Sequence, residues 1–285
     1  MLKPALSFKD QVLLLQSRGM VIDDSQAAEN FLREHNYYLL NIYFHKQMDT
    51  VNHFKKGIRF DNIIQIFEYD RWLRNQLLWL LEPIEVKLKT VITHHLAIKY
   101  GPDCFYKNTC FENQLVFNKV VCAFQEEIDR DKQSSVYRHH QSKYAGKFPI
   151  WVIATFLTFG DITNLYYSLF RSDKEEIARK NYGIDANHLN SWINSLRLLR
   201  NICAHYGYLY QRKLNRNPQS IGKEASIQAL PGNLFIYCMA IKCLSNPKDW
   251  KTFYSNLLNT VPDTPYLSLK DFGFPEHWQD ILAPN

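Results

Sequence analysis

Apolar residues recur along this chain with the three-to-four-residue spacing of amphipathic α-helices over nearly its whole length. The longest such stretch runs from Asp61 to about Tyr100. Its apolar positions form one broad stripe: Ile64, Phe67, Trp72, Leu73, Leu77, Leu80, Leu81, Ile84, Leu88, Val91 and Ile92. The chain has only 10 glycines, too few for a fold rich in β-hairpins. We therefore predict an all-α fold.

Pro83 interrupts the longest stretch. A proline inside a helix removes one backbone hydrogen bond and crowds the preceding turn. We therefore expect this helix to bend, or to divide near Leu81 and Glu82. Gly101 and the proline after it then end the helix.

Two shorter helices are expected before the longest one. Ser7 is placed to cap a first helix that ends at Gly19, and Asp24 or Ser25 is placed to cap a second. The apolar positions of this second helix include Phe31, Leu32, Tyr38, Leu39 and Ile42.

The second half of the chain alternates helices with polar segments. The charge-mixed segment from Glu126 to Lys147 is predicted to be a mobile connection between helices, or a loop that gates a substrate site. Asn187 or Asn190 is expected to begin a helix that runs up to the residues of greatest chemical interest.

Three further features are predicted towards the C-terminus. The polar residues from Asn215 to Lys223 indicate a loop. Pro231, Gly232 and Asn233 are expected to open a helix that continues through Leu244. The proline-containing tail from Pro262 to Asn285 is predicted to form irregular chain or short helical turns.

The composition is typical of a soluble globular protein, with 285 residues, 46% hydrophobic and 22% charged. No uncharged stretch reaches the ~18 residues that a membrane-spanning helix needs. The short apolar run at Leu13 has no small-residue cleavage site after it, which argues against a secretion signal. We therefore expect a cytoplasmic protein without a membrane partner. A net charge of +6 is compatible with a nucleic-acid partner but does not require one.

The cysteines and histidines do not form a recognisable metal site. Six cysteines stand at positions 104, 110, 122, 203, 238 and 243 without a C-x-x-C pair, and we expect reduced, mostly buried thiols. The adjacent pairs His94–His95 and His139–His140 would diverge by about 100° on a helix, and no H-E-x-x-H motif occurs. We predict neither a metal nor a cofactor.

The strongest candidate chemistry is a run of six residues, Arg200-Asn201-Ile202-Cys203-Ala204-His205. Cleavage of RNA needs a base for the ribose 2′-hydroxyl, an acid for the departing 5′-oxygen and a cation on the phosphate. An unperturbed imidazole titrates near pH ~6.5, so a histidine can serve as acid or base. Arginine stays charged, and its guanidinium group can bind two phosphate oxygens at once. Arg200, Asn201 and His205 are therefore candidate catalytic residues.

Helical geometry limits what these three side chains can do together. Asn201 and His205 are four residues apart and share a face, whereas Arg200 is offset from His205 by roughly 140°. The segment has one histidine, while separate acid and base roles need two, and a symmetric dimer would supply both. The alternative is structural, because this spacing arises by chance in a chain of this length. It also describes a helix end with an ion-paired arginine and a capping or core histidine.

A buried carboxylate could hold the arginine in place. Glu85 and Asp70 are the candidates for such a pair with Arg200. Glu82 and Glu85 lie three residues apart with two lysines nearby, so a surface ion-pair cluster is the simpler expectation for them.

Basic and aromatic residues surround the six-residue run, as in surfaces that combine phosphate contacts with base stacking. The candidate RNA-binding residues are Arg197, Tyr206, Tyr208, Tyr210, Arg212, Lys213 and Arg216. A solvated basic helix end explains the same pattern without RNA.

The sequence around this run resembles the HEPN superfamily. The phrase Leu-Arg-Asn-x-Cys-Ala-His, which ends at His205 and has an aromatic, basic continuation, is similar to the Abi-like family of bacterial abortive-infection proteins, of the AbiD/AbiF type. The resemblance also includes Phe67–Arg74, Leu81–Lys89 and Phe148–Trp151, and covers roughly residues 1–245. It implies a HEPN-like helical bundle with additional N- and C-terminal helical segments. We expect a single all-α domain over residues 1–285, with its core at approximately 60–245, an N-terminal helical segment at 1–59 and a C-terminal extension at 246–285.

The resemblance also implies an anti-phage, metal-independent endoribonuclease that works as a homodimer, with Arg200, Asn201 and His205 in its active site. This chain has Tyr208 where many Abi-like sequences place an arginine. Two alternatives stay open: a non-catalytic RNA-binding scaffold that holds a structured or partner RNA, and an interaction partner within a toxin–antitoxin pair. The expected partners are RNA, a second copy of the chain and an RNA or protein antagonist.

Overall fold

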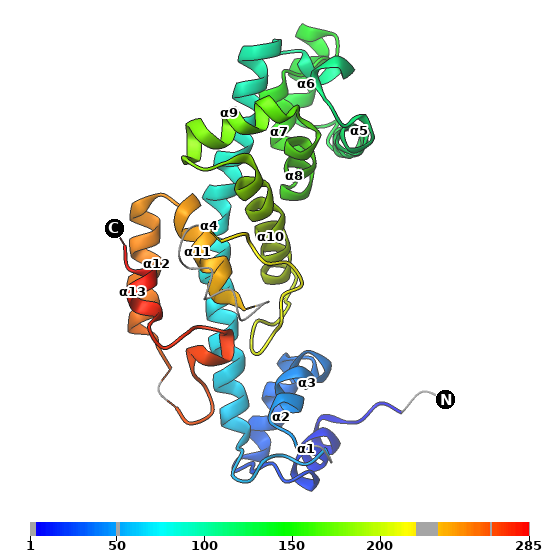
Figure 1. Ribbon diagram of the computed structural model, residues 1–285. Helices are drawn as coiled ribbons and strands as arrows, with labels where there is room; N and C mark the ends of the chain where they lie inside the picture. The colour runs from blue at the N-terminus through cyan, green and yellow to red at the C-terminus, as the bar shows by residue number, and fades with distance from the viewer. Residues whose placement is uncertain (1–3, 50–51, 221–232, 263, 285) are drawn as a thin grey trace.

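The computed structural model describes residues 4–49, 52–220, 233–262 and 264–284 (Figure 1). These residues form thirteen α-helices, α1 to α13, with a few short 3-10 helices between them and no β-strand. The predicted all-α fold is confirmed. Over the same residues, none of the helices combines the length and the apolar character that crossing a membrane would require.

Helix α4 (Phe60–Tyr100) is the spine of an elongated molecule (Figure 1). Its 41 residues span about 60 Å at the usual rise per residue. Buried side chains are spaced along its whole length, from Ile63 through Leu80 to Leu96. Helices α3, α7, α8, α9, α10, α11 and α12 therefore pack against one continuous apolar face.

The predicted division of this long helix near Leu81 and Glu82 is wrong, because α4 remains helical through Pro83. Proline has no N–H group, so the carbonyl group of Trp79, four residues earlier, lacks its usual helical hydrogen bond. Both Pro83 and Trp79 are exposed. Water can replace that bond on an exposed face, while the helices packed on the opposite face hold the axis.

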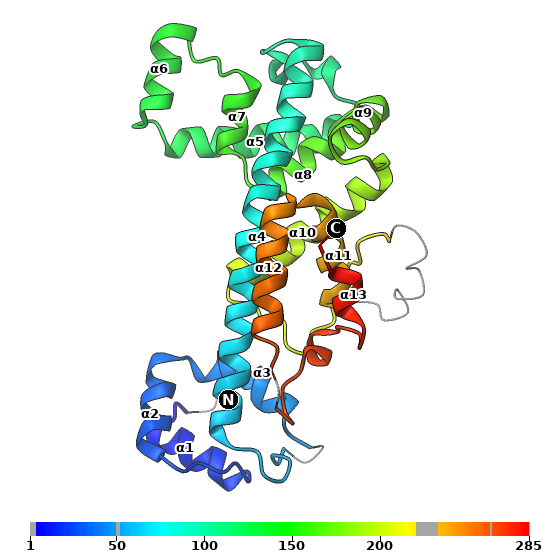
Figure 2. The ribbon, with the colours of Figure 1, turned by 90° about the vertical axis from the view of Figure 1, so that its left-hand side faces the viewer.

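Three short helices lie around the beginning of α4 (Figure 2): α1 (Phe8–Ser17), α2 (Ser25–Glu34) and α3 (Tyr37–Lys46). Ser7 caps α1 and Asp24 caps α2, as predicted. The stretch expected to form one second helix forms two. The break occurs because the side chain of Asn36 accepts a hydrogen bond from the N–H of Tyr38 at 2.8 Å and so caps a new helix.

The other end of α4 is surrounded by the green helices of Figure 1: α5 (Gln114–Arg130), α6 (Ser135–Tyr144), α7 (Ile150–Phe156), α8 (Phe159–Ser168) and α9 (Arg171–Tyr182). Short 3-10 helices at Cys104–Tyr106 and Asn108–Cys110 lead into α5. The mobile connection predicted between Glu126 and Lys147 is wrong over most of its length, since α5 and α6 occupy it. Ser134 caps α6, and the buried ring of His140 stacks on Phe148 with centroids 4.6 Å apart.

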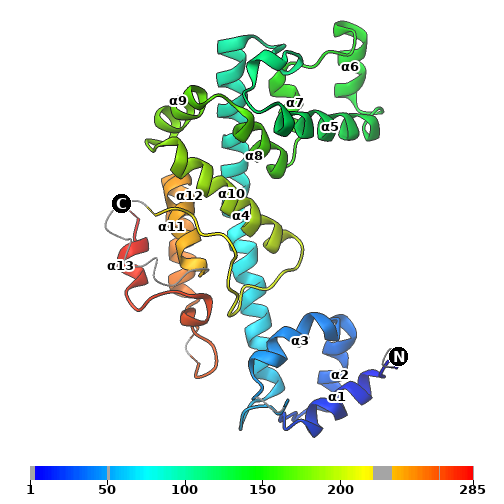
Figure 3. The same cartoon turned by 45° about the vertical axis from the view of Figure 1, so that its right-hand side comes forward.

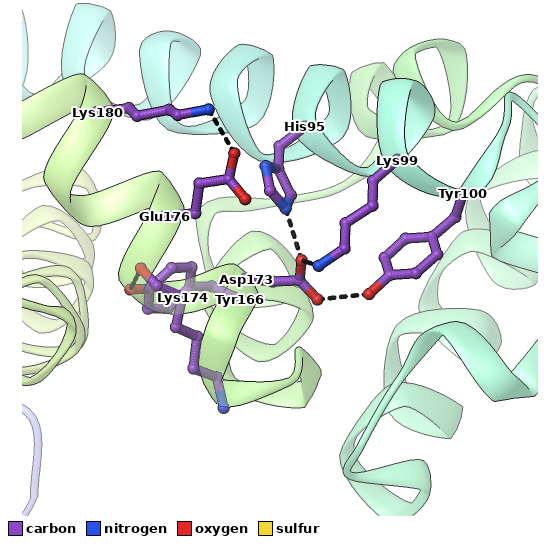
Figure 4. Close-up of polar contacts among 8 residues, drawn as sticks. All are labelled: His95, Lys99, Tyr100, Tyr166, Asp173, Lys174, Glu176 and Lys180. Carbon is purple, nitrogen blue, oxygen red and sulfur yellow. Dashed lines mark hydrogen bonds and ion pairs between the residues drawn. The ribbon is translucent and has the colours of Figure 1, made fainter.

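A buried carboxyl group ties α9 to the end of α4 (Figure 4). Asp173 is fully buried and hydrogen-bonds to His95 Nε2 at 2.7 Å, Lys99 Nζ at 2.6 Å and Tyr100 Oη at 2.8 Å. Burial raises the pKa of Asp173, but the three hydrogen bonds outweigh it, so this pKa lies below its ordinary value.

Replacing Asp173 by Asn is expected to lower the free energy of unfolding by about 2 kcal/mol near neutral pH, because His95 and Lys99 lose a charged acceptor. A carboxyl group with a lowered folded-state pKa stabilises the fold above its unfolded-state pKa of about 3.9, and that contribution is lost as the pH falls through the folded-state value. Urea unfolding of both proteins at neutral pH and at about pH 3.5 measures this. The difference in free energy of unfolding between the two proteins should be smaller at the lower pH. An unchanged difference would contradict the lowered pKa of Asp173.

Helix α10 (Ala186–Ala204) crosses the middle of the molecule and packs against α4, α8, α9 and α11 (Figure 3). Its start was predicted at Asn187 or Asn190, and both residues lie inside the helix. The helix begins earlier because the side chain of Asp185 accepts hydrogen bonds from the N–H groups of Asn187 and His188.

The remaining elements lie beside the middle of α4 (Figure 2): α11 (Leu234–Leu244), α12 (Pro247–Asn259), a 3-10 helix η4 (Leu269–Phe272) and α13 (Trp278–Leu282). Asn233 caps α11, and this helix ends at Leu244 as predicted. The predicted loop is confirmed for residues 215–220, and the predicted short turns are confirmed for the described part of the tail. Residues 221–223, Pro231, Gly232 and Asn285 lie outside the described residues.

Candidate functional site

Helix α10 ends inside the candidate catalytic run, and His205 is its C-cap. The next residue, Tyr206, has a left-handed backbone with a φ of 58°. The N–H of Gly207 donates to the carbonyl oxygen of Ile202 at 2.8 Å, which is the bond pattern of a Schellman helix end. Main-chain hydrogen bonds therefore shape this helix end, and the side chain of His205 is not needed for it.

The two residues after His205, Tyr206 and Gly207, both occupy backbone positions that favour glycine. Gly207 is needed, because a Cβ there would lie 2.8 Å from both the Cγ2 atom and the carbonyl oxygen of Ile202. Tyr206 stands where glycine is usual, at a cost of about 1 kcal/mol of backbone strain. Its side chain is 80% exposed, so packing does not explain the strain. Tyr206 therefore keeps an exposed aromatic ring at a backbone position that its packing does not explain.

Arg200 lies partly buried on α10, with its Nε atom 3.7 Å from Oε2 of Glu85 on α4 and 36% of its side chain exposed. The side chain of Glu85 is 13% exposed and also pairs with Lys89 at 3.0 Å. Of the two carboxylates that could hold Arg200, the structure selects Glu85. The expected surface ion-pair cluster is confirmed only for Glu85 and Lys89. Glu82 is exposed, whereas the largely buried Glu85 also faces α10.

The other two candidate catalytic side chains differ in exposure, since Asn201 is half-buried and His205 is exposed. Within the described part of the chain, no hydrogen bond or ion pair joins the side chains of Arg200, Asn201 and His205. One chain therefore offers a cation that is ion-paired with Glu85 and an exposed imidazole towards the same end of α10, without a hydrogen bond or ion pair between them among the described residues.

Cys203, inside the same run, is buried, and burial raises its pKa to about 12. A thiol in this state is a poor nucleophile. All six cysteines are free thiols and four of them are buried, as the sequence predicts.

A buried carboxyl group fastens the loop that follows the candidate catalytic run. Asp70 on α4 is fully buried, and its Oδ1 atom accepts hydrogen bonds from the N–H groups of Leu209 and Tyr210, both at 2.7 Å. Its Oδ2 atom accepts from Arg74 Nε at 2.9 Å and from Tyr43 Oη at 3.0 Å. Burial raises the pKa of Asp70, and the backbone N–H groups and Arg74 oppose that rise. The loop is thus tied to both α4 and α3.

Tyr210 is part of this attachment. Its ring is 1% exposed and is not accessible to a base, against the expectation that it binds RNA. Its hydroxyl accepts hydrogen bonds from Gln47 Nε2 at 2.7 Å and Gln211 Nε2 at 3.1 Å, and burial raises its pKa to about 12. Gln211 also bonds Asp271 of η4 at 2.9 Å, so the C-terminal segment supports the same loop.

The other candidate RNA-binding residues lie mainly along this loop. Tyr208 is half-buried, and the guanidinium group of Arg212 lies 4.8 Å from its ring centroid. Lys213 and Arg216 are exposed. Arg197 is half-buried on α10, and its Nε atom is buried without a hydrogen-bond partner among the residues that the structure describes. Cationic groups thus continue along the chain after His205.

A groove of about 790 Å³ lies between α3, α4 and the end of α10, and we refer to it as the motif groove. The loop after α10, yellow in Figure 3, lies close to α3 at this place. Its lining includes Tyr38, Leu39, Arg71, Asn75, Ala204 and Tyr206. Sequence reasoning missed the α3 wall of this groove, because nothing in the local pattern connects Tyr38 with Tyr206.

The fold and the site define a class of protein. It is all-helical and carries an arginine, an amide and an exposed histidine at the end of its central helix. A model of the Abi-like protein family matches residues 30–211, more than half of the chain. The protein belongs to the Abi-like family. The matched region includes α3 to α10, Asp70 and the loop that Asp70 holds. No curated protein and no solved structure matches the chain.

Proposed function

We propose that this Abi-like protein is a metal-independent endoribonuclease of the HEPN superfamily, of the AbiD/AbiF type, that acts in abortive infection in the cytoplasm. One observation carries the proposal: Arg200, ion-paired with Glu85 at 3.7 Å, lies towards the end of α10 where the imidazole of His205 is exposed. A positioned cation and an accessible acid–base group are what RNA cleavage by protein side chains needs. Membership of the Abi-like family supports the biological role.

In the proposed reaction, the ribose 2′-oxygen attacks the adjacent phosphorus while an imidazole takes its proton. The P–O5′ bond breaks as a second group protonates the departing 5′-oxygen. The products are a 2′,3′-cyclic phosphate and a 5′-hydroxyl. His205 fills one of the two proton-transfer roles, Arg200 binds the phosphate, and Asn201 orients one of these groups.

A second copy of the chain completes the proposed site. One chain presents one exposed histidine at the end of α10, and the reaction uses an acid and a base. In an isologous homodimer, a contact around this helix end brings the partner subunit's His205 to the same phosphate. Gel filtration and cross-linking with RNA present test this, and a strict monomer contradicts the mechanism in this form.

The endoribonuclease proposal is tested with total cellular RNA in excess EDTA. Wild-type protein is expected to cleave it and to leave cyclic phosphate ends, while the Arg200→Ala/His205→Ala variant is expected to leave the RNA intact. The matched control is Arg171→Ala/His94→Ala, which removes an exposed arginine and an exposed histidine elsewhere and should cleave as wild type does. Equal cleavage by the wild type and the Arg200→Ala/His205→Ala variant would contradict the endoribonuclease proposal.

The alternative is an RNA-binding scaffold that holds a structured or partner RNA. It is favoured by the exposed aromatic rings of the motif groove and by the cations after His205, since neither feature requires proton transfer. In that case both the wild type and the double variant retain RNA and neither yields a product. A toxin–antitoxin partner, with an RNA or protein antagonist on this surface, is the remaining candidate.

A further inference from the structure

Two tyrosines on different walls of the motif groove expose most of their surface. Tyr38 on α3 is 82% exposed, and Tyr206 at the end of α10 is 80% exposed. Leu39, also in the lining, is 52% exposed. Apolar and aromatic surface gathered in one groove is costly to leave in water, and such a groove is typical of a binding site. Its volume is within the usual range for sites that hold ligands of nucleotide size.

The backbones of both tyrosines are fixed although their rings are free. The N–H of Tyr38 donates to the side chain of Asn36 at the start of α3. Tyr206 is held by the helix end, through the bond from Gly207 to Ile202. Because the backbones are already fixed, only the two side-chain torsions of each ring become ordered when a flat ligand stacks on it.

The charges around the groove suit a ligand with phosphate groups. Arg71 lies in the lining with an exposed side chain, and its ion pair with Glu68, at 3.4 Å between two exposed groups, is weak. His35 and His45 are also in the lining, where the one acidic residue is Glu34 among the residues that the structure describes. Arg71 is thus free to exchange its carboxylate partner for a phosphate.

The groove reaches the chain neighbours of His205, although none of Arg200, Asn201 and His205 lines it. Ala204 and Tyr206 both line it, and they are the chain neighbours of His205.

We propose that the motif groove holds an unpaired nucleotide of single-stranded RNA, stacked on Tyr38 and Tyr206 with a neighbouring phosphate on Arg71. Base stacking on aromatic rings is sequence-tolerant and needs a base outside a duplex. The α3 wall thus makes the N-terminal helices the element that selects single strands. The placement of the nucleotide next to the cleaved phosphate rests on the proposed endoribonuclease function, while the binding of single-stranded RNA does not.

The test measures binding in the Arg200→Ala/His205→Ala background, so that cleavage does not interfere. The probe is a short single-stranded RNA that carries 2-aminopurine, followed by fluorescence anisotropy and by quenching of the base. Adding Tyr38→Ala is expected to weaken binding on the order of 10-fold, the usual effect of losing one stacking contact, and to reduce the quenching, since Tyr206 remains. Adding Tyr38→Phe, which keeps the ring, should preserve both signals. The same RNA annealed to its complement should not respond to either change.

Tyr144→Ala is the matched control, because it removes a tyrosine that is 52% exposed on α6, outside the groove. Unchanged single-strand binding after Tyr38→Ala overturns the inference, as does a background protein that binds no single-stranded RNA. If Tyr38→Ala weakens binding but the wild type does not cleave RNA, the binding of single-stranded RNA in the groove is supported and the endoribonuclease proposal is contradicted. If the wild type cleaves RNA but Tyr38→Ala does not weaken binding, the endoribonuclease proposal is supported and the binding of RNA in the groove is contradicted.

Discussion

His205→Ala is expected to reduce RNA cleavage by about 10²- to 10⁴-fold, the range that a general acid or base contributes. The side chain of His205 is exposed, and the helix end is made by main-chain bonds between Gly207 and Ile202. Removal of the imidazole should therefore change neither the fold nor the affinity for RNA by much. Initial cleavage rates and dissociation constants for the same RNA, measured with both proteins, separate the two effects.

His94→Ala is the control for this experiment, since His94 is an exposed histidine on α4. It should cleave at the wild-type rate. A His205→Ala protein that cleaves as fast as wild type would show that the imidazole takes no part in the reaction. A protein that loses affinity and cleavage in parallel would assign His205 to RNA binding instead.

The sequence predicted well those features that depend on local patterns. The apolar stripe of α4 was recognisable because a helix buried along one face must repeat its apolar residues every three to four positions. The caps at Ser7 and Asp24 were recognisable because a side-chain oxygen placed before an apolar run satisfies free N–H groups.

The sequence misled where packing decides the outcome. Pro83 was expected to divide α4, but its exposed position lets solvent replace the lost bond. The polar stretch before Lys147 was expected to be mobile, but the buried ring of His140 on Phe148 anchors α6. Neither the exposure of a proline nor the partner of a histidine can be read from neighbouring residues.

The candidate site was half predictable for the same reason. Residue types and spacing located Arg200 and His205, and two carboxylates were named for the arginine. Only the fold shows that Glu85 takes that role while Asp70 binds the loop behind His205. Alternating tyrosines suggested one surface, yet Tyr206 is exposed and Tyr210 is buried, because the loop turns its chain towards α3 between them.

Asp70→Ala is expected to lower the free energy of unfolding by roughly 3–5 kcal/mol, the usual cost of removing one partner from a buried ion pair. Arg74 would keep its charge at 6% exposure without a carboxylate, and the N–H groups of Leu209 and Tyr210 would lose their acceptor. Urea or thermal unfolding measures the loss. Glu68→Ala, on an exposed face of the same helix, should stay within about 0.5 kcal/mol of wild type.

The double variant Asp70→Ala/Arg74→Leu distinguishes the unpaired charge from the loss of the loop attachment. Without the guanidinium group no buried charge is left unpaired, so part of the stability should return. The N–H groups of Leu209 and Tyr210 still lack their acceptor, so the loop after His205 should remain loose and RNA cleavage should remain low. Full recovery of cleavage together with stability would show that Asp70 serves only to neutralise Arg74. Recovery of stability alone would show that the carboxyl group positions the loop on which the site depends.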